Sequence, residues 1–470
     1  MNKRSPDIGA ALAGLIGDAA VIRDPAGMPA YLNEPRKRFH VRAAAVALPS
    51  DVAQVQAIAR WANTSGVKLI PQGGNTGLVG AQVPLSGDEV IVSLKRLDRV
   101  RGIDAQAGNM TLEGGVVLET AHKLAEDAGA MFPLWIASQG SARIGGILSS
   151  NAGGVQVLAF GNARELCLGI EAVLPDGRLY QGLNALKKDN TGYDLKDLFI
   201  GAEGTLGFIT AATLKLFPQP DGYETALCNV SGPEAALRLF YLMRERAGSR
   251  LTAFELMPRF GIDLQIKHRM LERDPTASSS PWYALVEINR MKGGVLGALS
   301  DGLEEAMEAG IISDASVAMS ERDRVAMWAA REQMSDVQSR EGASIKHDVS
   351  VPIAAVPALI AEGISATSTV VDGIRPCAFG HMGDGNIHFN FSQPVGADPK
   401  AFMAREADLN AAIYAVVGKL GGSISAEHGI GQLKTRLLRR VKDPVALEMM
   451  RAIKRALDPN GIMNPGKLLD

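Results

Sequence analysis

Four side chains in the last quarter of the sequence have types and spacing that suit metal and proton chemistry. His381 and His388 lie in the segment F-G-H-M-G-D-G-N-I-H-F-N-F, and Glu427 and His428 follow in I-S-A-E-H-G. The chain has seven histidines in 470 residues, so this concentration stands out. Two imidazoles and a carboxylate are ligands that zinc accepts, with an open position left for water or substrate. The pattern predicts a reactive metal site.

The connection between the first two histidines predicts their distance. The dipeptide Asp384-Gly385 separates two apolar runs and is typical of a two-residue β-hairpin turn, in which both central residues need positive φ. A turn centred there pairs His381 with His388. Paired residues have Cβ atoms about 4.5–5.5 Å apart, a span that one cation can bridge at metal–nitrogen distances of about 2.0–2.1 Å.

The last two of these residues are expected to divide the chemistry between them. Glu427 supplies the oxygen ligand of the metal. His428 points away from it on an extended chain, which leaves its imidazole as the general base. The alternative is that the histidines are ordinary hydrogen-bonded residues on a polar strand face.

Length and composition limit the class of protein. A chain of 470 residues is expected to divide into two or three lobes. The formal net charge is −2 with dispersed basic residues, which argues against a nucleic-acid partner, and no stretch reaches the ~20 apolar residues of a membrane span. Three separated cysteines in apolar contexts, Cys167, Cys228 and Cys377, predict reduced core residues of a cytoplasmic protein.

Three glycine-rich segments precede residue 219. They are 72–77, which follows a capped helix opened by Ser50 and a short strand, then 140–154 with too few apolar residues for a core helix, and 200–210. Clustered glycines bring backbone N–H groups together, which suits a pyrophosphate. Each alone is compatible with a tight structural turn, but three in one lobe indicate a large polyphosphate ligand. The sequence has no G-x-G-x-x-G motif, so a Rossmann-type site is not expected.

After residue 219 the order of predicted elements is strand, helix, strand, strand, helix, strand, which is the split βαβ or ferredoxin-like pattern. A looser repeat follows, ending in a strand at 422–426. We therefore expect one antiparallel sheet, with helices on one face, that carries the metal ligands. The predicted fold class is α+β, with a cofactor domain at 1–219, a substrate and metal domain at 220–426, and a segment at 427–470 that returns to the first domain.

Long ordered motifs across nearly the whole chain resemble a known family. P-Q-G-G-N-T-G-L-V-G, I-G-G-I-L-S-S-N-A-G-G, D-N-T-G-Y-D-L-K-D-L-F-I-G-A-E-G-T-L-G, G-H-M-G-D-G-N-I-H and M-N-P-G-K-L resemble the FAD-linked oxidases and dehydrogenases of the vanillyl-alcohol oxidase type. Within that group they are most similar to D-2-hydroxyglutarate and D-lactate dehydrogenases. The resemblance implies a two-subdomain FAD-binding fold with a substrate domain, and FAD held without a covalent bond because no histidine lies within 71–80.

The resemblance also implies which residues contact FAD. Gln72 stands where relatives often have arginine, which weakens the transfer at that position. The implied cofactor residues are Pro71, Gly73, Gly74, Asn75, Thr76, Gly77, Gly140, Ser141, Gly145, Gly146, Asn151, Gly153, Gly154, Glu203, Gly204, Ile209 and Asn464.

Substrate choice within the family depends on cationic and polar side chains. Arg331, Ser335 and Lys346 match positions that surround a carboxylate in the 2-hydroxyglutarate enzymes, with Asn386 and His428 completing the substrate site. Arg331 and Ser335 are one helical turn apart and are expected to share a face. Two cations and a metal suit a dianionic hydroxy acid. The alternative is an ordinary charged surface helix.

The expected reaction is metal-assisted oxidation of D-2-hydroxyglutarate, or D-malate, to the 2-oxo acid by hydride transfer to flavin N5. Zinc is the favoured metal, and the resemblance suggests an electron-transfer flavoprotein or a quinone as acceptor. A homodimer remains open as the assembly. The alternatives are a D-lactate or glycolate dehydrogenase on the same scaffold, a flavin carrier without catalysis, and a metallohydrolase in which the glycine segments are merely turns.

Overall fold

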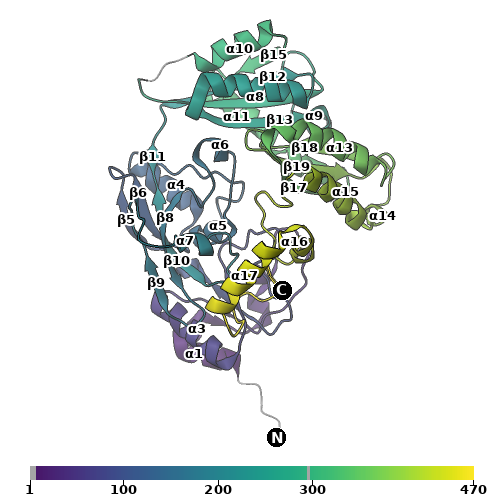
Figure 1. Cartoon of the computed structure of the whole chain (residues 1–470). Coiled ribbons are helices and arrows are strands. Elements are labelled where there is room, and N and C mark those ends of the chain that lie inside the picture. The colour runs from purple at the N-terminus through teal and green to yellow at the C-terminus, as the bar shows by residue number, and fades with distance from the viewer. Residues whose placement is uncertain (1–6, 294–296, 470) are drawn as a thin grey trace. The chain divides into compact units, whose positions relative to one another are not determined.

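The computed structural model describes residues 7–293 and 297–469. The chain forms two compact units, whose helices and strands are labelled in Figure 1. Each unit contains helices and predominantly antiparallel sheets, as the predicted α+β class requires. Among the described residues, no helix combines the length and apolar composition needed to cross a bilayer. Unit 1 comprises residues 1–154, 161–219 and 427–470, and unit 2 comprises residues 155–160 and 220–426.

Unit 1 begins with a four-stranded sheet of order β1-β2-β4-β3. The strands β2, β4 and β3 are parallel, and α3 supplies the crossover that a parallel connection needs. All but one residue of these three parallel strands is buried. The bounds are β1 (Val21–Ile22), β2 (Ala45–Ala47), α3 (Val52–Ser65), β3 (Leu69–Gln72) and β4 (Val90–Ser93); α1 (Ile8–Ile16) and α2 (Pro29–Leu32) precede α3.

The helix α3 is stabilised at both ends by its own sequence. Its N-cap is Asp51, whose carboxylate accepts from the backbone N–H of Gln54, and not Ser50 as expected. Ser50 instead donates its backbone N–H to the Gln54 side chain. Gly66 ends the helix at φ 76°, a left-handed cap that favours glycine. The sequence therefore predicted the helix correctly and its cap one residue too early.

The second sheet of unit 1 has five antiparallel strands in the order β5-β6-β10-β8-β9. Its bulges lie in the pairs β10–β8 and β5–β6. The bounds are β5 (Val100–Asp104), β6 (Asn109–Glu113), β8 (Cys167–Val173), β9 (Leu179–Gly182) and β10 (Phe208–Lys215); α4 (Leu118–Asp127), β7 (Ala130–Met131), α7 (Lys196–Phe199) and β11 (Phe217–Pro218) also belong to this unit.

The glycine-rich segment 140–154 folds differently from the loop that its composition predicted. A helix, α5 (Ile144–Ser150), forms within it and packs against β10. Ile144, Ile147 and Leu148 are buried at helical spacing, so three apolar residues suffice when the helix is only two turns long. The helix ends at Asn151, which adopts φ 51°.

The C-terminal segment packs within unit 1. Its helices α16 (Thr435–Val441) and α17 (Pro444–Leu457), yellow in Figure 1, are followed by a bridge between Met463 and Leu69 at the edge of the first sheet. Lys454 donates to the backbone carbonyls of Thr205 and Met463. The bridge connects the end of the chain to an early strand, and the bond to Thr205 connects α17 to the third glycine-rich segment.

Unit 2 contains the predicted ferredoxin-like arrangement. Its antiparallel sheet has the order β13-β14-β12-β15, in which the two central strands are the first and third along the chain. Helices α8 and α10 pack on one face. The opposite face carries α11 and neighbouring helices, so helices cover both faces and not one. The bounds are β12 (Gly222–Val230), α8 (Pro233–Ala247), β13 (Leu251–Pro258), α9 (Arg259–Lys267), β14 (Trp282–Arg290), α10 (Ala298–Glu308), β15 (Ile312–Val317), α11 (Glu321–Glu332) and α12 (Met334–Ser339); α6 (Val157–Phe160) joins this unit.

A second sheet in unit 2 repeats this strand order in reduced form. Its central strand β19 pairs with β18 on one side and with β16 and β17 on the other. The strand expected at 422–426 is reduced to one bridge between Ser423 and Ser350. A bridge between Leu256 and Gly380 connects the two sheets, so the expected single sheet is in fact two. The bounds are β16 (Ser344–Ile345), β17 (Asp348–Ser350), α13 (Val356–Ser368), β18 (Arg375–Phe379), β19 (Asn386–Ser392), α14 (Pro399–Met403) and α15 (Glu406–Lys419).

Candidate functional site

A glycine-walled pocket of about 490 Å³ lies in unit 1. This volume is within the usual range of small-molecule sites, roughly 300–1,000 Å³. All three glycine-rich segments contribute to its wall, and Glu427 and His428 line it as well. The predicted cofactor residues that line the pocket are Pro71, Gly73, Gly74, Asn75, Thr76, Gly77, Gly145, Gly146, Gly153, Glu203, Gly204 and Ile209.

Close packing of backbone explains two of these glycines. A Cβ on Gly74 would lie 2.0 Å from the carbonyl oxygen of Ser141, and one on Gly145 would lie 2.9 Å from that of Ile209. Since real Cβ atoms are not found at such distances, a side chain at either position would force the wall apart. The glycines therefore let separate backbone segments meet around the pocket.

Other predicted cofactor residues support the wall from outside the pocket lining. Asn151 accepts the backbone N–H of Arg164 through its side-chain oxygen. Asn464 donates to the carbonyls of Ala81 and Glu203, and a Cβ on Gly154 would collide with the carbonyl of Trp135. The predicted cofactor residues outside the lining are Gly140, Ser141, Asn151, Gly154 and Asn464.

Glu203 holds the loop that carries Glu427 and His428. Its buried carboxylate accepts the backbone N–H groups of Ile430 and Gly431, both at 2.7 Å. Burial raises the pKa of Glu203, although these two hydrogen bonds oppose the shift. Because Ile430 is two residues beyond His428, this carboxylate fixes the loop on which His428 and Glu427 lie.

The loop between β18 and β19 is wider than the sequence predicted. Phe379, and not His381, lies opposite His388 in the register. Gly380 leaves the hairpin to pair with Leu256 of β13, with hydrogen bonds of 2.8 and 3.0 Å. The predicted two-residue turn at Asp384 and Gly385 is therefore wrong, because pairing with another strand opens a six-residue connection over 380–385.

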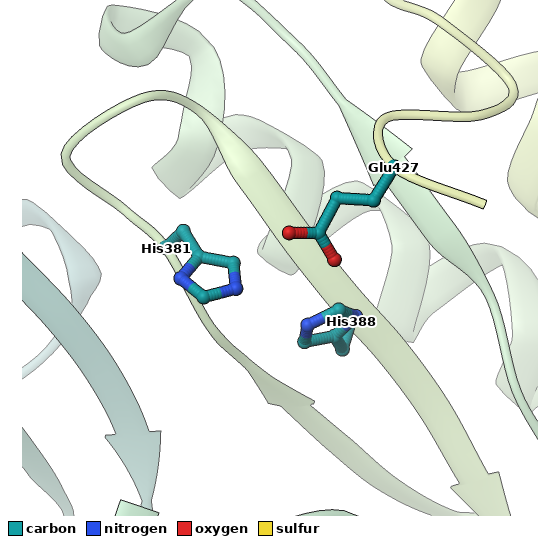
Figure 2. Close-up of side chains that lie close together, drawn as sticks. All are labelled: His381, His388 and Glu427. Carbon is teal, nitrogen blue, oxygen red and sulfur yellow. The ribbon is translucent and has the colours of Figure 1, made fainter. Parts of the chain in front are cut away.

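The wider loop nevertheless brings the two imidazoles together. The ring centroids of His381 and His388 are 5.4 Å apart at an interplanar angle of 73°. With Glu427, which directly follows the last residue of unit 2, they offer three ligand atoms that lie within 4.8 Å of one another. Figure 2 shows the two rings and the carboxylate pointing toward one another. This donor set fits a tetrahedral zinc ion with one open position.

A second group of potential ligands shares one residue with the first. Asp348, Glu427 and His428 also have side-chain atoms within 4.8 Å of one another. The expectation that His428 points away from Glu427 is therefore wrong, because residues 426–428 form a bend and not an extended strand. Asp348 lies on β17 opposite His388 and is buried. The sequence reading did not identify Asp348, whose position in the register only the strand pairing reveals.

A buried carboxylate that the sequence reading missed contacts His381. Glu255 of β13 accepts from His381 Nδ1 at 2.7 Å through one oxygen and from Arg331 Nε at 2.5 Å through the other. Burial is the largest influence on the pKa of Glu255 and would raise it, but the charges and hydrogen bonds of Arg331 and His381 together lower it to about 2. A single acidic residue inside the apolar strand L-T-A-F-E-L-M was the signal that could have identified it.

Of the predicted substrate residues, Arg331 and Lys346 are cationic and Asn386 lies on β19. Arg331 lies in the last turn of α11 and Ser335 in the first turn of α12, so a helix break at Gln333 replaces the single helix that was expected. Lys346 donates to the Ser335 carbonyl and hydroxyl at 2.9 and 2.8 Å.

Asn386 is held by its amide nitrogen. That nitrogen donates to Asp348 and to the Val349 carbonyl, each at 3.0 Å. Its buried side-chain oxygen has no hydrogen-bond partner among the described residues. An unsatisfied buried acceptor is costly, so this oxygen is available to a donor group of a ligand.

Family comparisons match two consecutive parts of the chain. Residues 43–182 match the family described as "FAD binding domain", and residues 219–468 match "FAD linked oxidases, C-terminal domain". The second match alone covers more than half of the chain.

Curated relatives are similar over nearly the full length. The D-2-hydroxyglutarate dehydrogenase of Stutzerimonas stutzeri is 34% identical over 457 residues, which cover 97% of this chain and 97% of the relative. The mitochondrial D-2-hydroxyglutarate dehydrogenase of Bos taurus is 36% identical over 428 residues, 90% of this chain and 76% of the relative. A D-2-hydroxyglutarate–pyruvate transhydrogenase of Saccharomyces cerevisiae is 32% identical over 454 residues, 95% of this chain and 90% of the relative.

Solved structures support the fold. p-Cresol methylhydroxylase superposes with a TM-score of 0.77 at 16% identity, covering 100% of this chain and 98% of that one. An alkyldihydroxyacetonephosphate synthase gives 0.74 at 16% identity, covering 98% and 85%. This likeness confirms the predicted vanillyl-alcohol oxidase type of fold.

Proposed function

The chain belongs to the FAD-linked oxidases, and we propose that it oxidises D-2-hydroxyglutarate, and also D-malate, to the corresponding 2-oxo acid. It is a FAD-dependent oxidoreductase by family. The observation that carries the proposed reaction is the position of Glu427 and His428. Both line the glycine-walled pocket, and Glu427 also groups with His381 and His388.

FAD fits the glycine-walled pocket by its chemistry. The exposed backbone of the three glycine-rich segments suits a pyrophosphate, and Glu203 and Asn464 hold the surrounding loops. When bound, FAD supplies the acceptor for the hydrogen and electrons that leave the alcohol carbon. The absence of histidine from 71–80 supports non-covalent attachment.

Zinc fits the donor set of His381, His388 and Glu427. Two imidazoles and a carboxylate whose ligand atoms lie within 4.8 Å match a three-ligand catalytic site. Zinc bound there would act as a Lewis acid toward the α-hydroxyl oxygen. The three residues would hold the ion, and a three-ligand zinc site can bind a substrate oxygen as its fourth ligand.

His428 is proposed to take the hydroxyl proton. Its imidazole lines the pocket, and the loop that carries it is fixed by the bonds from Ile430 and Gly431 to Glu203. A neutral imidazole has one ring nitrogen with a free lone pair. A ring nitrogen of His428 can therefore accept a proton when the substrate hydroxyl is presented to it.

Cationic side chains are proposed to select a dicarboxylate. Lys346 is positioned by two oxygens of Ser335, and Arg331 lies beside His381 with its Nη2 3.4 Å from Nε2. Asn386, two residues before His388 on β19, is proposed to lie beside the substrate. Each carboxylate of a 2-hydroxy diacid would gain a charge-assisted partner, whereas a monocarboxylate would use only one of the two cations.

An anaerobic substrate panel tests this function. Loss of flavin absorbance is measured with D-2-hydroxyglutarate, D-malate, D-lactate and glycolate, each with and without chelator. We expect the two dicarboxylates to bleach the flavin fastest and chelation to stop them. Faster bleaching by D-lactate or glycolate would instead support the monocarboxylate alternative. A colourless protein that hydrolyses esters would support the metallohydrolase, against which family membership argues.

Two substitutions test the site residues. His428→Ala and His381→Ala are each expected to abolish turnover while FAD stays bound, because the first removes the base and the second a metal ligand. His268→Ala is the matched control, since His268 binds Glu341 and belongs to neither group of potential metal ligands. Full activity of His428→Ala would remove the assignment of the base.

The acceptor and the setting of the reaction are further parts of the proposal. An electron-transfer flavoprotein or a quinone is proposed as acceptor, and the name of the yeast relative makes pyruvate the comparison to include.

Three free, buried cysteines support a reducing compartment, for which we propose the cytoplasm, although some relatives are named mitochondrial. Light scattering of the flavoprotein distinguishes a monomer from the proposed homodimer.

A further inference from the structure

We propose that Glu255 is a positioning residue that holds the metal ligand His381 and the substrate cation Arg331 in one geometry. The inference rests on the proposed function, because Glu255 does not line the pocket and acts only through the proposed metal and substrate residues. Its side chain is 1% exposed. Both of its oxygens are used, one for each partner.

The bond to His381 sets the ring's tautomer. A carboxylate that already accepts from a guanidinium is an acceptor toward the imidazole too, so Nδ1 carries the proton. The lone pair of His381 then lies on Nε2. That is the form in which an imidazole binds a metal, and a carboxylate on the opposite nitrogen also fixes the ring's orientation and strengthens it as a ligand.

The bond to Arg331 places a cation beside the same ring nitrogen. Arg331 Nη2 lies 3.4 Å from His381 Nε2, and the guanidinium lies over the Phe379 ring, 5.0 Å from its centroid. A substrate carboxylate bound to Arg331 would therefore lie next to the metal-facing side of His381. The negative charge of Glu255 also offsets the repulsion between the guanidinium and a nearby divalent ion.

A neighbouring carboxylate provides the matched control. Glu287 of β14 is 1% exposed and binds Arg324, an arginine on the same helix as Arg331. Its other partners are the Thr225 hydroxyl and the Trp328 indole N–H. Loss of Glu287 therefore removes a buried carboxylate and its ion pair without removing a contact to His381.

Zinc affinity of the purified flavoprotein tests the inference without relying on turnover. Glu255→Gln, Glu287→Gln and the wild type are stripped with chelator, and Zn²⁺ is titrated in competition with a chromophoric chelator. We expect Glu255→Gln to bind Zn²⁺ about 10- to 100-fold more weakly than wild type and Glu287→Gln to bind it as wild type does, with FAD content equal in all three. Cobalt substitution adds a spectroscopic signature, which we expect to change only in Glu255→Gln.

The outcomes separate the inference from the function on which it rests. If wild type binds Zn²⁺ and Glu255→Gln binds it equally well, the positioning role of Glu255 is overturned while the metal site stands. If wild type binds no Zn²⁺, the proposed metal site fails and the inference fails with it. Should Glu255→Gln not fold, the double variant Glu255→Met, Arg331→Met carries the same test, because it leaves no unpaired buried charge; wild-type Zn²⁺ affinity in it would overturn the inference.

Discussion

Two arginine–glutamate pairs with buried carboxylates connect α11 to the same sheet of unit 2, and each arginine also lies over an aromatic ring. The Arg331 side chain is 8% exposed and that of Arg324 is 22% exposed. Arg324 binds Glu287 and covers the Tyr223 ring at 4.1 Å. Arg331, seven residues further along the helix, binds Glu255 and covers the Phe379 ring at 5.0 Å. Two pairs on one helix thus have nearly the same local construction.

The two pairs differ in what their carboxylates bind next. The remaining hydrogen bonds of Glu287 come from Thr225 and Trp328, whose side chains are neutral and do not titrate. The second oxygen of Glu255 accepts from a histidine. An arginine–glutamate pair is thus compatible with a purely structural role and with the positioning of a site residue. The further hydrogen-bond donor to the carboxylate distinguishes the two roles.

Removing each arginine is the largest expected perturbation. Arg324→Met and Arg331→Met both leave a buried carboxylate without its cation, so each is expected to destabilise unit 2 by about 3–5 kcal/mol. Only Arg331→Met is expected to lose turnover of D-2-hydroxyglutarate beyond its loss of folded protein. Thermal unfolding and kcat/KM per folded flavin are the measurements. Equal losses of kcat/KM in the two variants would end the distinction between the pairs.

Lys346 is the second cation, besides Arg331, that is proposed to bind a substrate carboxylate. Lys346→Met is expected to raise the KM for D-2-hydroxyglutarate by about 10- to 100-fold, the loss of one charge-assisted hydrogen bond, and to change the KM for D-lactate much less. Steady-state kinetics with both substrates are the test. Lys267→Met is the control, because Lys267 is a more exposed lysine that binds Glu341. An equal effect on D-lactate would contradict dicarboxylate selection by Lys346.

Acid sensitivity gives the smallest expected difference. The pKa of Glu255 is lowered from 4.5 to about 2, so its ionised form stabilises the fold fully above about pH 4.5, and this contribution is lost as pH falls toward 2. The melting-temperature gap between wild type and Glu255→Gln, measured on chelator-treated protein, is expected to be constant from pH 6 to 8 and to narrow below pH 4.5. A gap that widens on acidification would reverse the sign of this linkage.

Local sequence signals predicted the elements well and some partners badly. The split βαβ order in unit 2 followed from apolar periodicity, which is a property of neighbouring residues. The Asp384-Gly385 turn was mispredicted because Gly380 pairs with Leu256, a residue more than a hundred positions away. No local rule anticipates a partner at that distance.

By itself, the sequence determined the glycine-rich segments and the family. It also determined four candidate residues for metal binding and proton transfer, namely His381, His388, Glu427 and His428. Those features depend on residue type and on short spacing, which can be recognised in the linear sequence. Only the tertiary structure decided that Glu255 lies between Arg331 and His381 and that Glu203 holds the loop beyond His428. A buried carboxylate acquires its role from the donors that surround it, and strands and loops distant in sequence bring those donors.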